Sequence, residues 1–170
     1  MTTTTTKLYS LSLSDVKTYL FALVFIAGNI LFPQLAHLIP QGGLIFLPIY
    51  FFTLIGAYKY GIFVGLLTAI LSPLTNNLLF GMPPTAALPA IFVKSVVLAI
   101  AAAVIAERTG KVSFWGILLA VLAYQVVGTG VEWIMTQSFV VAVQDFRIGF
   151  PGILIQLVGG YFVLKALART

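Results

Sequence analysis

Residues 85–106 read TAALPAIFVKSVVLAIAAAVIA and contain a single charged side chain, Lys94. A run of this length and apolarity can cross the roughly 30 Å hydrocarbon core of a bilayer as an α-helix, which takes about 20 residues. The rest of the chain has the same character, since 61% of its 170 residues are hydrophobic and 8% are charged. So few charges cannot coat a soluble domain, and the composition equally excludes a disordered, fibrous or nucleic-acid-binding protein. The lipid bilayer is therefore the expected partner of most of the surface.

Breaks made by charged residues, proline and glycine divide the apolar sequence into spans of membrane-crossing length. Pro33 is expected to end the first span, and Pro48 to lie in the first turns of the second, where its missing amide costs little. Residues 1–170 are predicted to form a single integral membrane domain, in which residues 1–16 are a cytoplasmic tail and helix start. The fold class is thus an all-α, six-transmembrane-helix bundle, with spans at residues 17–32, 43–58, 61–80, 85–106, 113–137 and 149–168.

The basic residues fall mostly on one side of these spans. Because Lys and Arg are enriched in cytoplasmic loops, this asymmetry places both termini in the cytoplasm. At the start of the first span, Ser12 and Asp15 are expected to cap the free amides of the helix, as in a capping box. Arg147 alone falls on the outer side, and the side of the termini carries Lys7, Lys17, Lys59, Arg108, Lys111, Lys165 and Arg169.

Lys94 lies inside a predicted span, where a charge is costly and marks a functional site by default. At about 1.5 Å per residue it lies roughly 12 Å below the outer end of its helix. Polar or small side chains repeat at helical spacing along residues 125–136, so one face of that helix meets protein or water. We expect a cavity that opens outward and holds a small polar metabolite. Its candidate substrate-binding residues are Asn76, Asn77, Lys94, Gln125, Glu132, Trp133 and Gln156.

A purely structural interpretation of the same residues stays open. Lys94 can snorkel, or pair with Glu132 or a backbone carbonyl, and thereby hold helices together. Amide side chains such as Asn76 and Gln125 often form hydrogen bonds between helices. Trp133 suits an interfacial aromatic belt as well as a cavity wall. On this interpretation the protein is a six-span scaffold or assembly factor without a small-molecule ligand.

The chain lacks the residue patterns of the common enzyme classes. It has no cysteine, and His37 is its one histidine, which excludes thiol chemistry and a His-rich metal centre. A serine–lysine pair of Ser72 with Lys94 stays open, although nothing in the sequence places the two together. Neither a phosphate-binding glycine-rich loop nor an ATP-binding motif occurs. We expect no enzyme, no cofactor and no metal ion, and any energy for transport must come from other proteins.

The segment 72–84, SPLTNNLLFGMPP, leads into the fourth span. It resembles the end of the third helix in several S components, the substrate-binding subunits of energy-coupling factor (ECF) vitamin transporters. The chain length, the six helices, the internal termini and a first outer loop long enough to cap a pocket are similar as well. The resemblance implies an ABC-type importer subunit in the inner membrane of a prokaryote. Such a subunit would capture a vitamin-like substrate outside, associate with a transmembrane coupling protein and two cytoplasmic ATPases, and topple to release its cargo.

The resemblance also assigns residues 34–43 as a gating loop over the cavity. The substrate itself stays open. A cationic vitamin such as thiamine would favour Glu132 and Trp133 through charge and cation–π attraction, whereas Lys94 would suit a compound that bears a carboxylate or phosphate. The polar members of the gating loop are Gln34, His37 and Gln41.

Overall fold

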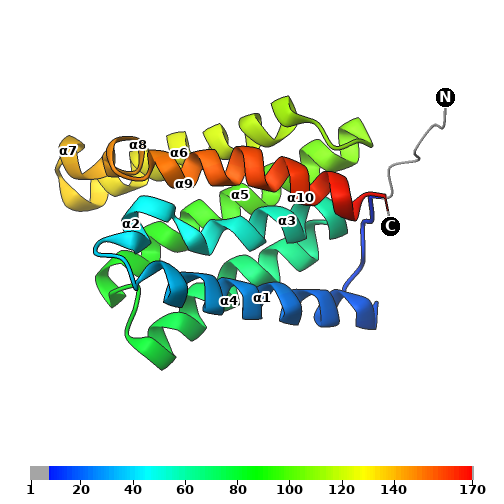
Figure 1. Ribbon diagram of the computed structural model, residues 1–170, viewed down its shortest axis with the longest axis horizontal. Coiled ribbons are helices and arrows are strands. Elements are labelled where there is room, and N and C mark those ends of the chain that lie inside the picture. Colours follow the sequence, from blue (N-terminus) through cyan, green and yellow to red (C-terminus); the bar gives the residue numbers. More distant parts are fainter. Residues whose placement is uncertain (1–7, 170) are drawn as a thin grey trace.

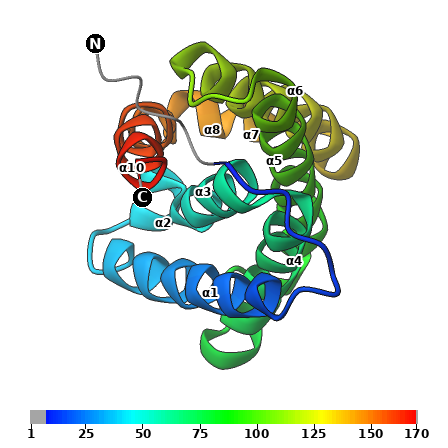
Figure 2. The same cartoon turned by 90° about the vertical axis from the view of Figure 1, so that its right-hand side faces the viewer.

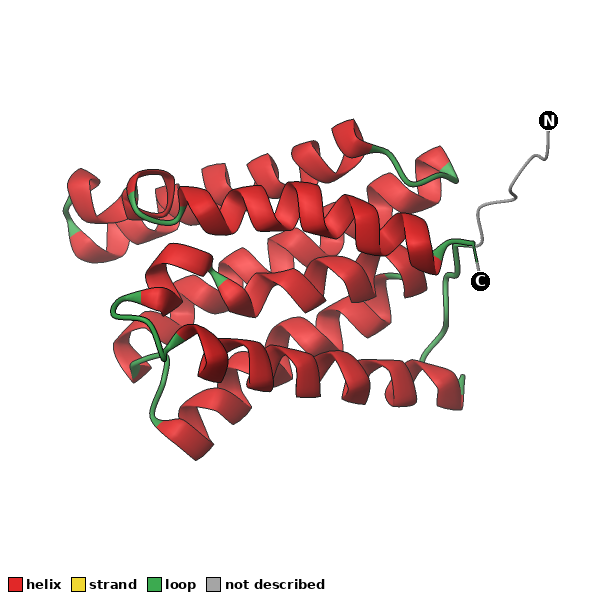
Figure 3. Cartoon of the chain, in the orientation of Figure 1, coloured by secondary structure: helices red, strands yellow, loops and turns green. Residues whose placement is uncertain are grey.

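The computed structural model describes residues 8–169, and every regular element in this part of the chain is a helix (Figure 3). The predicted all-α class is therefore confirmed for these residues. Of the predicted tail, residues 1–7 fall outside the described residues, as does residue 170. The α-helices are α1 (Val16–Ala36), α2 (Gly42–Phe46), α3 (Phe51–Tyr60), α4 (Ile62–Phe80), α5 (Leu88–Thr109), α6 (Phe114–Thr136), α7 (Phe139–Ala142), α8 (Gln144–Arg147), α9 (Phe150–Leu154) and α10 (Gly160–Leu167). The remaining helical turns are the 3-10 helices η1 (Pro48–Tyr50) and η2 (Thr85–Ala87) and the π-helix η3 (Ile155–Gly159).

Helices long and apolar enough to cross a membrane make this a multi-pass helical protein. Five stretches among the described residues meet that condition. They correspond to the first, third, fourth, fifth and sixth predicted spans. The stretches are Val16–Ala36, Ile62–Phe80, Thr85–Thr109, Phe114–Thr136 and Phe150–Leu167.

The second predicted span, residues 43–58, is not one continuous helix. The chain turns at Leu47, whose φ of 45° lies in the left-handed region, and Pro48 then starts η1 before α3 begins. Proline supplies no amide to the preceding turn and disfavours a right-handed helical residue before it, so the break falls at Leu47. α3 alone is too short to cross a bilayer. Instead, α2, η1 and α3 follow one another along the length of the bundle (Figure 1).

α1 continues through Pro33 to Ala36, so the prediction that Pro33 ends the first span is wrong. A proline inside a helix leaves the carbonyl four residues earlier without its usual amide donor. Here that carbonyl belongs to Asn29, and the Asn76 side chain of α4 donates to it from 2.8 Å. A neighbouring helix thus replaces the missing hydrogen bond, and residues 34–36 of the predicted gating loop are helical.

α3 lies at the centre of the bundle, with α1, α4, α5 and α10 around it (Figure 2). All of its residues from 53 to 59 are buried. Small residues permit this close packing, because a Cβ on Gly65 of α4 would lie only 2.5 Å from Cβ of Ala57 on α3 and 3.2 Å from Cβ of Ala99 on α5. Contacts of this kind are typical of helices that pack within membranes.

The two ends of the bundle are built from different elements (Figure 1). The first described residues and the C-terminal end of α10 lie at one end, here called the terminal end. There Tyr9 and Leu11 donate backbone hydrogen bonds to the carbonyls of Lys59 and Tyr60. α2, η2, α7 and α8 lie at the opposite end, here called the distal end. The cytoplasmic location of the terminal end stays a prediction.

Candidate functional site

A cavity of about 550 Å³ lies at the distal end of the bundle. Its size falls within the range of small-molecule sites, roughly 300–1,000 Å³. Apolar side chains of α2, η1 and residues 82–91 contribute much of its wall, and charged side chains enter it from α5, α6 and α8. The polar residues in its lining are His37, Gln41, Tyr50, Asn76, Lys94, Glu132, Gln144 and Asp145.

Lys94 is the centre of a buried ionic cluster in this cavity. Its Nζ lies 2.7 Å from Oε2 of Glu132 and 2.8 Å from Oδ2 of Asp145. Lys94 is 1% exposed and Asp145 4%, whereas the Glu132 side chain keeps 14% of its surface accessible. Hydrogen bonds of this length between ionised groups are among the strongest polar contacts in proteins. We call Lys94, Glu132 and Asp145 the charged triad.

Gly128 of α6 makes room for the Lys94 side chain. A Cβ at this position would collide with Cγ, Cδ and Cε of Lys94, so the aliphatic part of the lysine lies directly on the α6 backbone. Gly128 precedes Glu132 by about one helical turn, and the same face of α6 therefore seats the lysine stem and presents a carboxylate to its ammonium group. Asp145, the third member of the triad, comes from the short helix α8.

Each carboxylate of the charged triad uses one oxygen on Lys94. Within residues 8–169, no hydrogen-bond donor contacts Oε1 of Glu132 or Oδ1 of Asp145. Neither oxygen is fully covered by protein. Both residues line the cavity, and each carboxylate keeps one oxygen that can accept a further hydrogen bond.

Asn76 lines the cavity and also joins α1 to α4. Its Nδ2 donates to the Asn29 carbonyl at 2.8 Å and to the Ser72 carbonyl at 3.0 Å. The Asn29 side chain donates in turn to Oγ1 of Thr53 at 3.0 Å and to Oγ of Ser72 at 3.3 Å. Ser72 is therefore bonded within this amide network, whereas Lys94 is bonded within the charged triad.

The predicted gating loop is a short turn after α1 that leads into α2. His37 and Gln41 line the cavity. Gln41 has a φ of 59° and Leu47 a φ of 45°, so both ends of α2 adopt left-handed conformations. Such conformations cost a residue other than glycine about 1–3 kcal/mol and recur where a chain closes around a ligand. Gln34 lies in the last turns of α1 and donates to Oδ1 of Asn76 at 3.5 Å.

Gln125 and Gln156 do not belong to the cavity lining. Nε2 of Gln125 donates to the Tyr124 hydroxyl at 3.1 Å, and that hydroxyl donates to Oε1 of Gln156 at 2.9 Å. Gln156 lies in the π-helix η3, a local geometry that is frequent at functional sites. Oε1 of Gln125 and Nε2 of Gln156 have no partner among the described residues. The two glutamines form a separate buried cluster with Tyr124, and their contact with substrate stays a prediction.

Asn77 and Trp133 also lie outside the cavity lining. Asn77 donates to the Pro83 carbonyl at 2.8 Å and so holds the turn that follows α4. Trp133 is 53% exposed, and its ring packs edge-on against Phe139 with 5.4 Å between ring centroids. This position fits the interfacial belt that the sequence left open for Trp133.

Three buried residues of the distal half were not singled out from the sequence. Asp145 lies in a stretch expected to be a loop, although it is one of only four acidic residues in the chain and follows Glu132 on the same predicted side. Tyr50 is 3% exposed and packs against Tyr124 at 4.9 Å between ring centroids. Asn29 could have been found from the sequence, because it is a polar residue within an apolar span and a buried amide there requires a hydrogen-bond partner.

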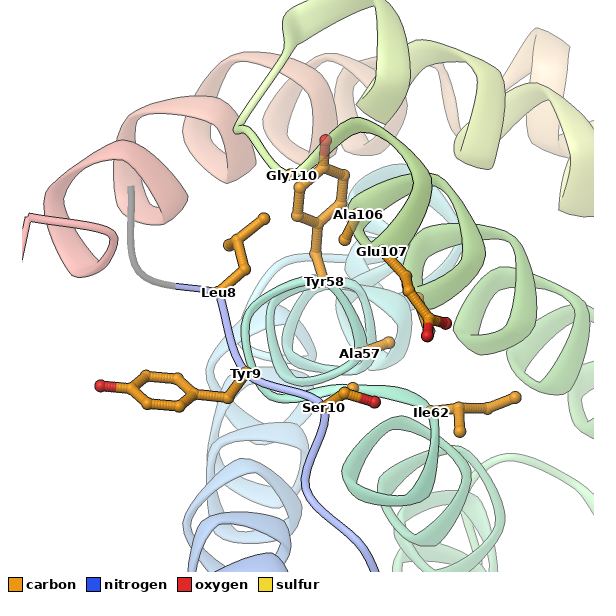
Figure 4. Close-up of a pocket in the computed structure, with 11 residues that line it drawn as sticks. Leu8, Tyr9, Ser10, Ala57, Tyr58, Ile62, Ala106, Glu107 and Gly110 are labelled. Atoms are coloured by element: carbon orange, nitrogen blue, oxygen red, sulfur yellow. The ribbon is translucent and has the colours of Figure 1, made fainter. Parts of the chain in front are cut away.

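A smaller cavity of about 340 Å³ lies at the terminal end (Figure 4). Residues 8–10 cross the end of α3 there, and the ring of Tyr58 points toward Gly110. The Tyr58 hydroxyl donates to the Lys111 carbonyl at 3.0 Å. Among the described residues of this wall, Glu107 alone is charged, and it is exposed. The ionic cluster is therefore a feature of the distal cavity.

Together these features define a multi-pass, all-helical membrane protein with a charged cavity at one end of its bundle. Within residues 8–169, no group of three His, Cys, Asp or Glu side chains is placed to hold a metal ion. In comparisons with protein-family models, curated proteins and solved structures, nothing matches this chain. Its function must therefore be inferred from the chemistry of the site.

Proposed function

We propose that this protein is the substrate-binding subunit of an ECF-type importer and captures a vitamin-like micronutrient in its distal cavity. The charged triad in the wall of a cavity of about 550 Å³ is the observation that supports the proposal. A transmembrane coupling protein and two cytoplasmic ATPases supply the energy in such a system. Toppling of the loaded subunit within the membrane then releases the cargo on the inner side.

The cost of burying the triad supports a binding role. Ionisable residues within membrane helices are rare and mark the paths of substrates or ions. Where an ion pair serves stability alone, apolar residues of similar volume often serve as well or better. The triad also borders space large enough for a ligand and leaves two carboxylate oxygens without donors.

The position of the cavity supports capture from outside. Lys17 lies in the first turn of α1, Arg108 in the last turn of α5 and Lys165 in the last turns of α10. These helix termini lie at the terminal end (Figure 1). Because basic residues favour the cytoplasmic side, the terminal end is expected to face the cytoplasm and the distal cavity the exterior.

A second interpretation, a membrane scaffold without a ligand, is favoured by the amide network around Asn76. This network connects α1, α3 and α4 through hydrogen bonds that need no ligand. Polar side chains commonly connect membrane helices in this way. On this interpretation the charged triad is a further connection, which joins α5, α6 and α8.

A ligand screen separates the two interpretations. The purified protein, in a non-ionic detergent, is heated with each of a panel of water-soluble vitamins and their precursors. Transport function predicts that at least one compound raises the melting temperature, since a ligand at 100 times its Kd stabilises the folded state by about 2.7 kcal/mol. Glu132→Ala is expected to abolish that increase, and Lys165→Ala, an exposed lysine of the terminal end, is expected to retain it.

The absence of stabilisation by any compound would favour the scaffold interpretation.

Co-purification provides an independent test of the energy source. A tagged form of the protein, isolated from its native membrane, is expected to bring down an ATPase pair and a transmembrane coupling protein. Isolation of a ligand-binding protein without any ATPase would contradict the importer part of the proposal.

A further inference from the structure

We propose that the ligand of the distal cavity is a small organic cation, bound through its positive charge to Glu132 and Asp145. The inference rests on the proposed function, because it names the substrate class of the same cavity. Suitable groups are an ammonium, an amidinium or an N-alkylated heteroaromatic ring. The choice between cation and anion, which the sequence leaves open, follows from the charges and free atoms of the triad.

The charge of the cavity is the first argument. Among its lining residues, Lys94 carries the only Lys or Arg charge and faces two carboxylates, which leaves one negative charge uncompensated when all three groups are ionised. Arg147, which follows Asp145 by two residues, is exposed and lies outside the cavity lining. A buried charge without a partner is costly, so the site favours a ligand that brings a positive charge.

The free carboxylate oxygens are the second argument. Oε1 of Glu132 and Oδ1 of Asp145 have no donor among the described residues and are not fully covered. They are acceptors in a cavity whose cation, Lys94, already donates to both neighbouring oxygens. A ligand ammonium or amidinium group can donate to them directly, and such charge-assisted bonds are stronger than neutral ones.

An anionic ligand fits the same site poorly. To reach the Lys94 ammonium, a carboxylate or phosphate must approach the negative charges of Glu132 and Asp145, and like charges repel more strongly at a partly buried site than in bulk water. An ammonium group has three donors, of which Lys94 uses two. The third donor suits a neutral acceptor on the ligand, such as a carbonyl, a hydroxyl or a ring nitrogen.

The apolar part of the cavity wall indicates what the uncharged part of the ligand is like. Leu44, Leu47 and Ile91 line the cavity, as does the ring of Tyr50. Apolar walls with few polar groups suit a compact apolar or aromatic body that carries its polar groups at one end. The combination points to a cationic heterocycle or an aryl amine in preference to a sugar or a polyanion.

The test is direct binding with probes sorted by charge. 1-Methylnicotinamide, nicotinamide and nicotinate share a pyridine ring but are cationic, neutral and anionic, and benzylamine, benzyl alcohol and benzoate form a second such series. Thiamine and choline extend the cations; riboflavin, pantothenate and biotin extend the neutral and anionic compounds. Titration calorimetry and thermal shift in a non-ionic detergent measure each compound. We expect the tightest binder to be a cation.

Different outcomes separate this inference from the proposed function. A tightest binder that is neutral or anionic overturns the inference and leaves the binding role standing. The absence of binding by any compound in the panel overturns the proposed function and the inference with it.

Charge-neutralising variants then test the role of the triad itself. Glu132→Gln and Asp145→Asn keep the side-chain shape, and each is expected to weaken binding of the best cation by roughly tenfold or more, the loss of one charged hydrogen bond. In Lys94→Met, the lysine ammonium no longer competes with the ligand for the two carboxylates. The cation should therefore raise the melting temperature of this variant by more than that of the wild type. Arg147→Gln is the control and should change the affinity by less than about twofold, because an exposed charge is screened.

A triad with a structural role only would behave differently. The increase in melting temperature caused by the cation would then stay as in the wild type in all three variants, whatever the stability of the free protein. That result would overturn the inference. If Lys94→Met does not fold, the affinities of Glu132→Gln and Asp145→Asn still decide between the two roles.

Discussion

Two lysines at opposite ends of the bundle are equally buried, each with 1% of its surface exposed, but they are held in different ways. At the distal end, Lys94 lies between two carboxylates in the wall of a cavity. At the terminal end, Nζ of Lys59 lies 4.9 Å from the ring centroid of Tyr9, and Lys59 is not part of the wall of the smaller cavity. Burial alone therefore does not identify a binding site. The feature that distinguishes Lys94 is its place in the wall of a cavity, beside two carboxylates.

Loss of the Lys94 charge is expected to have the largest effect on stability. Lys94→Met leaves two carboxylates without their cation, and breaking a buried ion pair in this way costs about 3–5 kcal/mol. The free energy of unfolding, measured by denaturant titration in detergent, checks this value. Lys165→Met, at an exposed position of the terminal end, is the control and should change stability by less than about 0.5 kcal/mol. Equal losses in the two variants would contradict the ionic role of Lys94.

The second prediction concerns the contact between the Lys94 side chain and Gly128 of α6. Gly128→Ala keeps every charge but places a methyl group where the lysine chain lies, and such overpacking costs about 1–3 kcal/mol. At Gly130 of the same helix, a Cβ would meet no atom within 4 Å. Gly130→Ala is therefore expected to be neutral or to stabilise the helix by about 0.5–1 kcal/mol. Thermal unfolding compares the two, and equal melting temperatures would show that Lys94 does not lie against Gly128.

A third prediction concerns the amide network that borders the distal cavity. Asn76→Ala removes the donor that satisfies the Asn29 carbonyl beside Pro33, and an unsatisfied buried group costs about 1–2 kcal/mol. Asn77→Ala is the matched control, because its bond to the Pro83 carbonyl is only partly buried and water can replace it. Chemical denaturation should show the larger loss at Asn76. A larger loss at Asn77 would contradict the helix-repair role given to Asn76.

The smallest effect is expected at the terminal end, where Asp15 precedes α1. The backbone amide of Ser12, and secondarily its hydroxyl, donates to the Asp15 carboxylate and holds the pKa of Asp15 below its ordinary value of 3.8. A lowered pKa means that the carboxylate stabilises the fold above the ordinary value, and that this contribution is lost as the pH falls through the lowered pKa.

Asp15→Asn should therefore be slightly less stable than the wild type at pH 7, and the two should converge in strong acid. Melting temperatures of both proteins across this pH range provide the measurement. A difference that persists unchanged in acid would argue against the carboxylate bonds at Ser12.

Much of the fold could be predicted because long apolar runs end at visible breaks. α4 and α6 begin and end within one residue of their predicted bounds. Hydropathy does not show how a neighbouring helix compensates for a helix breaker, and for this reason Pro33 was expected to end α1. The outcome at Pro48 differs, because Leu47 adopts a left-handed conformation and the helix breaks. Tertiary contacts, which local sequence does not encode, decide between the two outcomes.

The candidate site was predicted only in part, because sequence shows which residues are charged but not which side chains meet. Lys94 and Glu132 stand out as charges within apolar helices, and the structure brings them together. The depth of Gln125 and Gln156 could be estimated from the rise of a helix, but depth does not fix the direction in which a side chain points. Asp145 was missed because its helix, α8, has only four residues and no periodicity of its own.

The central claim is that the charged cavity faces the exterior while the terminal end faces the cytoplasm. The natural chain contains no cysteine, so single cysteines report on accessibility without interference. His37→Cys places a thiol in the cavity wall, and Arg108→Cys places one at the exposed C-terminal end of α5. With a membrane-impermeant maleimide, we predict that intact cells label His37→Cys and that Arg108→Cys reacts only after the membrane is opened. Labelling of Arg108→Cys in intact cells, with His37→Cys protected, would contradict the account.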